Sequence, residues 1–214
     1  MRTFFSGLDV GALGLLYQWG RKDPFLGSSS ISSSTLAKST ISWPSKVPSN
    51  TSNGTIAYAT ANPTTFIADN DRNYDWYYTG SSSIDNTRWT TSEKDKSIYD
   101  PCPAGWRVPD GGSKGVWSKA LGSSSDFVYA YSSSNEGMNF SGKFGSDSTI
   151  WYPASGCRSS GVGSLLDVGD CGYYWSASPG NSRTYNINDS GHVGPLYSYT
   201  RALGFSVRCL QESK

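Results

Sequence analysis

The segment HVGPLYSYTRALGFSVRC, residues 192–209, joins two kinds of sequence with different structural requirements. Its first half is rich in Gly, Pro, Ser and Tyr and has no hydrophobic period, which is typical of an irregular surface segment. In its second half Leu203, Phe205 and Val207 alternate with small or polar residues, which indicates a β-strand. A strand fixes the position of the loop that it ends, so we expect this loop to present its tyrosines on a defined surface.

Other patterned stretches predict more short strands. GYYWSAS (172–178) and RTYNIN (183–188) are interpreted as a hairpin, and LGFSVRCL (203–210) as the final strand. An early strand is expected over 15–19, with Leu15, Tyr17 and Trp19 on one face, and TIAYAT (55–60) predicts another brief strand.

Helical signals are rare. Val116, Trp117, Ala120 and Leu121 have helical spacing and Gly122 follows them, which predicts a helix over 113–121. The composition includes 24 Gly, 8 Trp and 14 Tyr, which favours short strands and long ordered loops around buried aromatic rings. We therefore predict an α+β fold forming a single domain over residues 1–214, with a Ser-rich insert at 27–68.

Charge and hydropathy exclude several classes of partner. Only 16% of residues are charged and the net charge is +1, whereas a nucleic-acid-binding domain needs a basic face. No apolar run approaches the roughly 20 residues of a membrane span, so no direct membrane insertion is expected. Asp9 interrupts the apolar stretch near the start and no small-residue cleavage site follows, which predicts no signal peptide in this chain.

The residues that usually carry chemistry are sparse. His192 is the only histidine, and no nucleophile elbow, phosphate loop or dinucleotide motif is present, so neither an enzyme nor a cofactor is expected. DNDRNYD (69–75) has the alternating acids of a calcium loop. Gly80 stands where that loop needs its bidentate acid, and a segment of Asx turns is the favoured interpretation.

The four cysteines leave alternatives open. If the protein is extracytoplasmic, Cys102 and Cys209 form a disulfide between the early and late parts of the chain; otherwise both are buried thiols. Cys157 and Cys171 flank a loop. Four dispersed cysteines without a CxxC spacing do not predict a metal site.

A set of aromatic and small polar residues near the end of the chain is the remaining candidate site. Tyrosine brings a large contact area at low entropic cost, and Asn, Ser and Gly add adaptable hydrogen bonds, as in antibody paratopes. The set comprises Tyr173, Tyr185, Tyr197, Tyr199, Asn181, Asn186, Asn188 and Asp189. Tyr174 and Trp175 are expected in the core.

A break in composition covers the same region. From Arg158 to Gly204 the chain has no Lys, Glu, Gln or Met, whereas the first 157 residues hold 13 of them. At that density about four would be expected in the window.

Several motifs, in order along the chain, resemble the major paralogous (FISUMP) domain of Bacteroidetes surface proteins. They are GLLYQWGRKDPF, DWYYTG with TRW, SIYDPCPAGWRVPD, YPASGCRS, GYYWSAS and RALGFSVRCL. The resemblance covers about 8–26 and 69–210. It implies a C-type lectin-like fold, in which N- and C-terminal strands pair and long loops present a ligand surface. The EPN and QPD triplets of calcium-dependent lectins are absent, so calcium-dependent sugar binding is not implied.

The C-terminal region also resembles the variable proteins of diversity-generating retroelements. Mutagenesis of adenines in an AAC codon cannot produce Lys, Glu, Gln, Met or Trp, which fits the break in composition. Residues 157–204 are then the variable region, with Trp175 as framework and Cys171 as a product of diversification. The resemblance implies as ligand-binding residues Ser159, Ser160, Asp167, Asp170, Tyr173, Asn181, Ser182, Asn188, Asp189, His192, Leu196, Tyr197, Ser198, Tyr199 and Thr200. Further diversified positions are Val162, Leu166, Cys171, Gly180 and Leu203.

The expected function is therefore ligand or receptor binding on a bacterial surface or a phage tail, within a larger assembly. The receptor is an unknown protein or glycan. One alternative is an invariant adhesin tip or structural assembly domain of the same fold. Another is an oxidase that uses Cys157 and Cys171, as formylglycine-generating enzymes use a cysteine pair.

Overall fold

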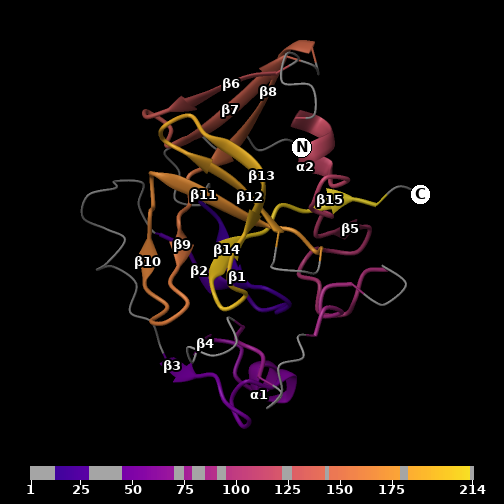
Figure 1. Ribbon diagram of the computed structural model, residues 1–214, viewed down its shortest axis with the longest axis vertical. Coiled ribbons are helices and arrows are strands. Elements are labelled where there is room, and N and C mark those ends of the chain that lie inside the picture. Colours follow the sequence, from indigo (N-terminus) through magenta and orange to yellow (C-terminus); the bar gives the residue numbers. More distant parts are fainter. Residues whose placement is uncertain are drawn as a thin grey trace.

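The computed structural model describes residues 13–28, 45–69, 75–78, 85–90, 95–121, 127–142, 145–178 and 183–212. In these ranges the protein is a mixed α+β structure, made mostly of strands with two short helices (Figure 1). The α+β prediction is confirmed. No helix in the described part of the chain is long and apolar enough to cross a membrane.

An eight-stranded sheet runs through the centre of the molecule (Figure 1). Its main path has the order β10-β9-β14-β11-β12-β13; β1 is added through β14, and β2 through β1. The strands are β1 (Leu15–Gln18), β2 (Phe25–Leu26), β9 (Cys157–Arg158), β10 (Leu165–Leu166), β11 (Cys171–Trp175), β12 (Arg183–Asn188), β13 (Val193–Ser198) and β14 (Gly204–Ser206). The hairpin predicted from 172–178 and 183–188 is confirmed as the antiparallel pair β11 and β12.

Strands from the two ends of the chain meet inside this sheet. β1 pairs antiparallel with β14, and Tyr17 lies opposite Phe205. The structure corrects two details of these strands. Leu15 is 41% exposed while Leu16 is fully buried. The final strand is shorter than 203–210, and Gly204, Phe205 and Ser206 are all buried, because β14 has paired strands at its edges and packed layers on both faces.

Smaller elements surround the central sheet. β6 (Phe127–Ser132), β7 (Gly137–Gly142) and β8 (Gly145–Pro153) form an antiparallel sheet, β3 (Ser45–Pro48) and β4 (Thr65–Ala68) a parallel pair, and β5 (Trp106–Arg107) and β15 (Leu210–Gln211) a ribbon. The helices are α1 (Ile56–Ala61) and α2 (Val116–Leu121). The predicted helix at 113–121 is confirmed from Val116 onward.

Residues 55–60, predicted as a strand, belong to helix α1. The Thr55 hydroxyl oxygen accepts a hydrogen bond from the Tyr58 amide (3.1 Å), which caps the first turn. The apparent alternation arises because three of the six helical residues are alanine, the best helix former. From Ser45 onward the predicted Ser-rich insert contains regular elements, β3, α1 and β4; residues 29–44 lie outside the described part.

The core has one aromatic cluster on each face of the central sheet. Tyr173, Trp175 and Phe205 pack with Trp19 and Trp89 on one face. On the other face Tyr174, Tyr185 and Ile187 pack against α2 and the β6–β8 sheet. Strand alternation sends neighbouring residues of β11 into different clusters, so the strand is buried on both faces.

A buried ion pair lies below the first cluster. Arg88 binds both carboxylate oxygens of Asp75, at 3.2 and 2.6 Å, and its guanidinium lies 4.9 Å from the ring centroids of Trp19 and Trp76. Because its partner carboxylate and two aromatic faces surround it, this arginine joins residues 19, 75–76 and 88 into one unit.

The disulfide considered from the sequence is present. Cys102 and Cys209 are joined, with their Cα atoms 5.7 Å apart and a sequence separation of 107. Cys157 and Cys171 are free. The bond attaches the segment after β14 to the one before β5, and the β5–β15 ribbon continues that connection.

Candidate functional site

Three turns lie together at one end of the central sheet. They are the β6–β7 turn (133–136), the β10–β11 turn (167–170) and the β12–β13 turn (189–192). The Asp189 amide donates to the Asp170 carbonyl (2.9 Å), and the Tyr131 hydroxyl donates to the Gly169 carbonyl. The β12–β13 turn and the start of β11 lie on the same side of the molecule in Figure 1. Residues far apart in sequence therefore share one surface.

A continuous row of side chains crosses this surface. The Tyr197 hydroxyl is 2.8 Å from His192 Nε2, and the ring centroids of Tyr197 and Tyr199 are 6.2 Å apart. Tyr199 meets Tyr173 edge to face at 5.4 Å, and the Tyr173 hydroxyl donates to Asp167 Oδ2 at 3.0 Å. We call these five residues the tyrosine face. His192, Tyr197 and Asp167 are exposed and Tyr199 is half-buried, so most of the row is open to solvent.

The residues 193–198, predicted as part of an irregular loop, form strand β13. Tyr185 of β12 faces two residues of β13, Pro195 and Leu196, so β13 carries a β-bulge. Sequence periodicity fails because the bulge interrupts the alternation, and Gly194 offers no side chain. A Cβ at Gly194 would collide with the Tyr197 ring in its present position. Pro195 has no N–H and so removes a backbone donor from this edge strand.

Tyr173 was expected on the ligand surface, and the structure corrects this. Its ring is 9% exposed and stacks on Phe205 at 4.8 Å, because odd-numbered residues of β11 point into the first aromatic cluster. Only its hydroxyl contributes to the face. Tyr185 (1% exposed) and Asn186 (6% exposed) are likewise interior residues of β12.

The structure separates Ser159 and Ser160 from the tyrosine face. Both are in the β9–β10 turn, where the Ser160 carbonyl accepts from the Asp69 amide (2.9 Å), next to β4. β9 leads away from the face to that turn and β10 leads back from it, so the turn with Ser159 and Ser160 does not share the surface of the tyrosine face (Figure 1). Val162, in the same turn, is 55% exposed.

The remaining predicted positions have mixed surroundings. Asp170, Asn188 and Asp189 border the tyrosine face, Leu196 and Ser198 are exposed on β13, and Thr200 and Leu203 are half-buried beyond its end. Asn181, Ser182 and Gly180 lie outside the described residues. The predicted calcium-like segment is described only at its two end residues, Asp69 and Asp75.

Sequence reasoning missed two residues beside the face. Glu136 and Tyr131 belong to β6 and its turn, and their proximity follows from backbone hydrogen bonds such as that from the Ala154 amide to the Glu136 carbonyl (2.8 Å). Burial raises the pKa of Tyr131, and the carboxylates of Glu136, Asp170 and Asp189 raise it further. Both residues precede the compositionally distinct window, so no signal in the sequence pointed to them.

The two free cysteines lie close to the tyrosine face. Burial raises the pKa of the Cys157 thiol to about 12, with smaller contributions from Asp167 and Cys171. Burial also raises the pKa of the Cys171 thiol. The thiolate is the form that attacks substrates or binds metals, and these environments favour the neutral thiol. Among the described residues no group of three His, Cys, Asp or Glu side chains is arranged to hold a metal ion.

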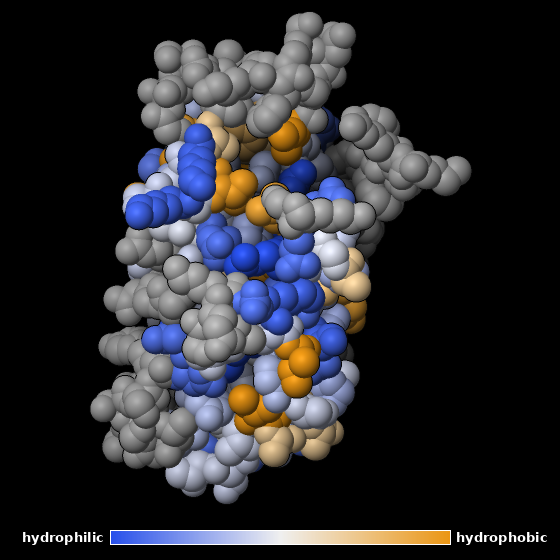
Figure 2. Space-filling model, turned by 90° about the vertical axis from the view of Figure 1, so that its right-hand side faces the viewer, coloured by the Kyte–Doolittle hydropathy of each residue, from blue (hydrophilic) through white to orange (hydrophobic). Residues whose placement is uncertain are grey.

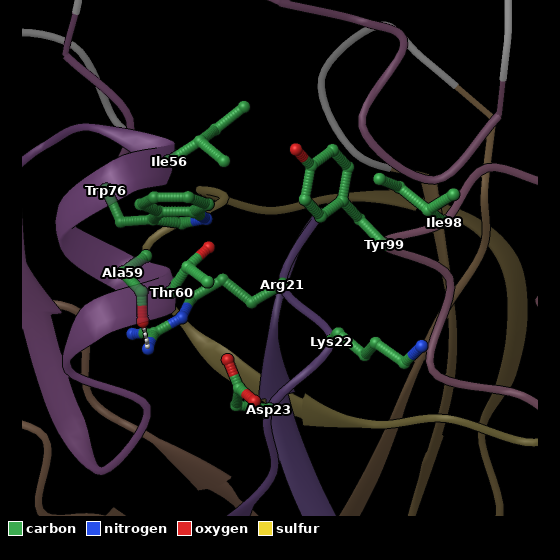
Figure 3. Close-up of a pocket in the computed structure, with 10 residues that line it drawn as sticks. Arg21, Lys22, Asp23, Ile56, Ala59, Thr60, Trp76, Ile98 and Tyr99 are labelled. Carbon is green, nitrogen blue, oxygen red and sulfur yellow. Dashed lines mark hydrogen bonds between the residues drawn. The ribbon is translucent and has the colours of Figure 1, made fainter.

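A small pocket is present near helix α1, at the other end of the molecule from β13 (Figure 1). Figure 3 shows the rings of Trp76 and Tyr99 on its two sides, with the Arg21 side chain crossing between them. The Arg21 guanidinium donates to Gln18 Oε1 (3.1 Å) and to four backbone carbonyls, including those of Thr65 (2.8 Å) and Ala59 (3.4 Å). The Arg21 side chain therefore has a structural role, because these hydrogen bonds attach α1 and β4 to the end of β1. The cavity of 160 Å³ is smaller than the roughly 300 Å³ of most ligand pockets.

The side of the molecule that carries the β5–β15 ribbon has a different character. Figure 2 shows its apolar residues in several separate groups among hydrophilic ones. Trp106 is 40% exposed and Leu210 42%, but scattered exposed apolar residues are normal on a protein surface.

Comparison of this chain with protein-family models, with curated proteins and with solved structures found no match.

Proposed function

We propose that the chain is a ligand-binding module with a C-type lectin-like fold, whose tyrosine face is diversified by a retroelement and binds a receptor. It would be displayed on a bacterial surface or a phage tail. The receptor is a protein or a glycan. The pairing of β1 with β14 agrees with the fold that the resemblance implies, because strands from the two ends of the chain meet there.

One observation carries the proposal: three segments bring tyrosines, a histidine and an aspartate into a single connected row that is largely exposed. The row contains no cysteine, serine or lysine, and tyrosine rings with adjacent polar groups are suited to holding a partner through contact area and hydrogen bonds. The row lies wholly within the window that lacks Lys, Glu, Gln and Met.

The diversification part is tested in the gene. Codons for Val162, Leu196, Thr200 and Leu203 should end in C or T, which the genetic code does not require for these residue types. A near-identical repeat that differs only at adenines should lie next to a reverse transcriptase gene. If that repeat is missing, diversification is wrong, and the proposals for the fold and for binding remain to be judged separately.

The binding part is tested with the protein. A screen against glycans and outer-membrane proteins should find a partner that the Tyr197→Ala/Tyr199→Ala variant no longer binds. Tyr129→Ala is a matched control, because Tyr129 and Tyr197 are both 41% exposed. Equal binding by the double variant and by wild type would contradict a role for the tyrosine face.

The burial of Tyr173 favours a second candidate, an invariant adhesin tip or assembly domain. A position that packs in the core is poorly suited to diversification, and the same face could then contact a sister subunit. Sequencing related copies from one strain distinguishes the two: uniform residues at 188–199 support the assembly domain, and variable residues support the binding module.

A further inference from the structure

The turns around the tyrosine face are rich in carboxylates. The three turns at this end of the sheet contribute Glu136, Asp167, Asp170 and Asp189, and none of them contains a Lys or Arg. The three aspartates are exposed. The face therefore combines aromatic rings with negative charge.

The described side chains of Arg158 and Arg201 do not neutralise this surface. Arg158 is 2% exposed and donates to the carbonyls of Leu26 and Gly163. Arg201 is 4% exposed and donates to the Asp85 carbonyl (2.8 Å) and Asn86 Oδ1 (2.6 Å). Both guanidiniums are used inside the structure, so they offer nothing to a partner at the surface.

The negative charge reaches the aromatic row itself. Burial raises the pKa of Tyr199, and the Asp167 carboxylate is among the groups that raise it further. Asp167 also accepts from the Tyr173 hydroxyl, which orients the carboxylate at the end of the row. An approaching cation would thus meet ring faces and carboxylates in the same place, and both attract it.

We propose that the partner of the tyrosine face is a protein surface that presents Lys or Arg side chains, held by cation–π contacts with Tyr197 and Tyr199 and by ion pairs with Asp167, Asp170 and Asp189. This inference rests on the proposed binding function and specifies its ligand class. Lipopolysaccharide and acidic glycans carry the same sign of charge as the face and would be repelled. Hydroxyl groups of a neutral glycan can donate to the aspartates, but such a glycan carries no charge to pair with the three carboxylates.

The test uses the whole protein against an immobilised array. Its arms are purified outer-membrane and secreted proteins with basic, neutral or acidic surfaces, lipopolysaccharide, and neutral and acidic glycans. Three variants accompany the wild type. The first is the face variant Asp167→Asn/Asp170→Asn/Asp189→Asn, and the second is Tyr197→Ala/Tyr199→Ala. The third, Asp23→Asn/Asp110→Asn/Glu212→Gln, changes net charge by the same amount away from the face.

Asparagine keeps the shape of the replaced side chain. It also tolerates the left-handed backbone at Asp167 (φ 56°), so the face variant should fold. Circular dichroism and the unfolding midpoint check this before binding is measured. If the triple variant is unfolded, the pair Asp170→Asn/Asp189→Asn, which avoids that position, takes its place.

The partners that depend on the tyrosines should be proteins with basic surfaces. Each exposed ion pair contributes about 1.4- to fivefold in affinity, so loss of all three should weaken binding by about three- to a hundredfold at low salt. The distant control should change affinity less than about twofold. Binding should also weaken as salt rises, because exposed charges are screened.

Two outcomes overturn the inference and are distinguishable. Partners that need Tyr197 and Tyr199 but bind the face variant as tightly as wild type would show that the face binds without regard to charge; the partner class would then be wrong and the binding function right. The absence of any partner that depends on the tyrosines would overturn the inference together with the function on which it rests.

Discussion

Substitutions at two neighbouring tyrosines should have very different effects on stability. Tyr197 is 41% exposed and Tyr173 is 9% exposed, although Tyr199 contacts both rings. If the face is mutable and the layer beneath it is framework, Tyr197→Ser should be tolerated and Tyr173→Ser should not. Comparing these two substitutions tests whether the surface that tolerates substitution ends between Tyr197 and Tyr173.

The magnitudes follow from the contacts. Tyr173→Ser removes a ring stacked on Phe205 at 4.8 Å, and removing a buried aromatic ring typically costs about 3–5 kcal/mol. Tyr197→Ser removes an exposed ring with two ring neighbours, Tyr199 and His192, and one hydrogen bond, so about 1 kcal/mol or less is expected. Tyr173→Phe keeps the ring and removes only the hydrogen bond to Asp167, which should cost about 0.5–1.5 kcal/mol.

Equilibrium unfolding in urea, followed by tryptophan fluorescence, measures these differences. The buried Trp19 and Trp175, which belong to the same cluster as Tyr173, should report its loss. Equal m-values would show that the denatured states are comparable. The reasoning is refuted if Tyr173→Ser costs less than about 1 kcal/mol, or if Tyr197→Ser costs more than about 2 kcal/mol, because burial would then not determine tolerance.

Three further outcomes are expected. The Cys102→Ala/Cys209→Ala variant should lose about 2–5 kcal/mol in urea unfolding, because the bond closes a loop of 107 residues; a loss below about 1 kcal/mol would contradict this. Burial raises the pKa values of Tyr174 and Tyr185, so the folded state retains their protons longer. Their contribution should be complete below pH 10 and fall above it by up to about 2.7 kcal/mol per pH unit, and a flat unfolding free energy between pH 9 and 11 would contradict it. Arg88→Met should cost about 3–5 kcal/mol, measured by thermal unfolding, because it removes the bidentate partner of the buried Asp75 carboxylate and leaves Arg201, at 3.7 Å, as its nearest cation.

The elements predicted well from the sequence are those whose pattern is local. The hairpin of β11 and β12 combines aromatic and β-branched residues with a short Ser/Gly-containing connection, and these signals lie within 17 residues. The Cys102–Cys209 bond is not local. It could be considered from sequence only as one of two alternatives, because its geometry depends on the fold.

The errors have specific physical causes. Residues 55–60 alternate large and small side chains, and the Thr55 cap that decides for a helix is a single hydrogen bond. Strand β13 was not predicted, because its bulge at Pro195 and Leu196 interrupts the alternation of side chains that indicates a strand. Ser159 and Ser160 lie close in sequence to the binding residues, but the β9–β10 hairpin carries them away from the face. Glu136 reaches the face only through tertiary contact with a second sheet.

Hydrogen bonds between backbone amides and carbonyls hold the turns beneath the tyrosine face, and these bonds do not depend on side-chain identity. The Asp170 and Cys171 amides both donate to the Asp167 carbonyl, at 3.2 and 2.9 Å, and the Gly191 amide donates to the Asn188 carbonyl at 3.0 Å. Gly191 has a φ of 77°, a conformation that glycine adopts without strain. A turn fixed in this way keeps its shape when the exposed side chains change, as a diversified face requires.

Asp167 is the exception among the exposed positions of the face, because its own φ of 56° constrains the residue type. Asp, Asn and Gly adopt this region readily, whereas a β-branched residue would be strained. Variation at 167 should therefore be confined to these small residue types even if the surrounding positions vary widely. Where residue 167 is Asp or Asn, the scaffold places a carboxylate or an amide at the end of the tyrosine row, and under the proposed function the neighbouring exposed positions would determine which partner it helps to bind.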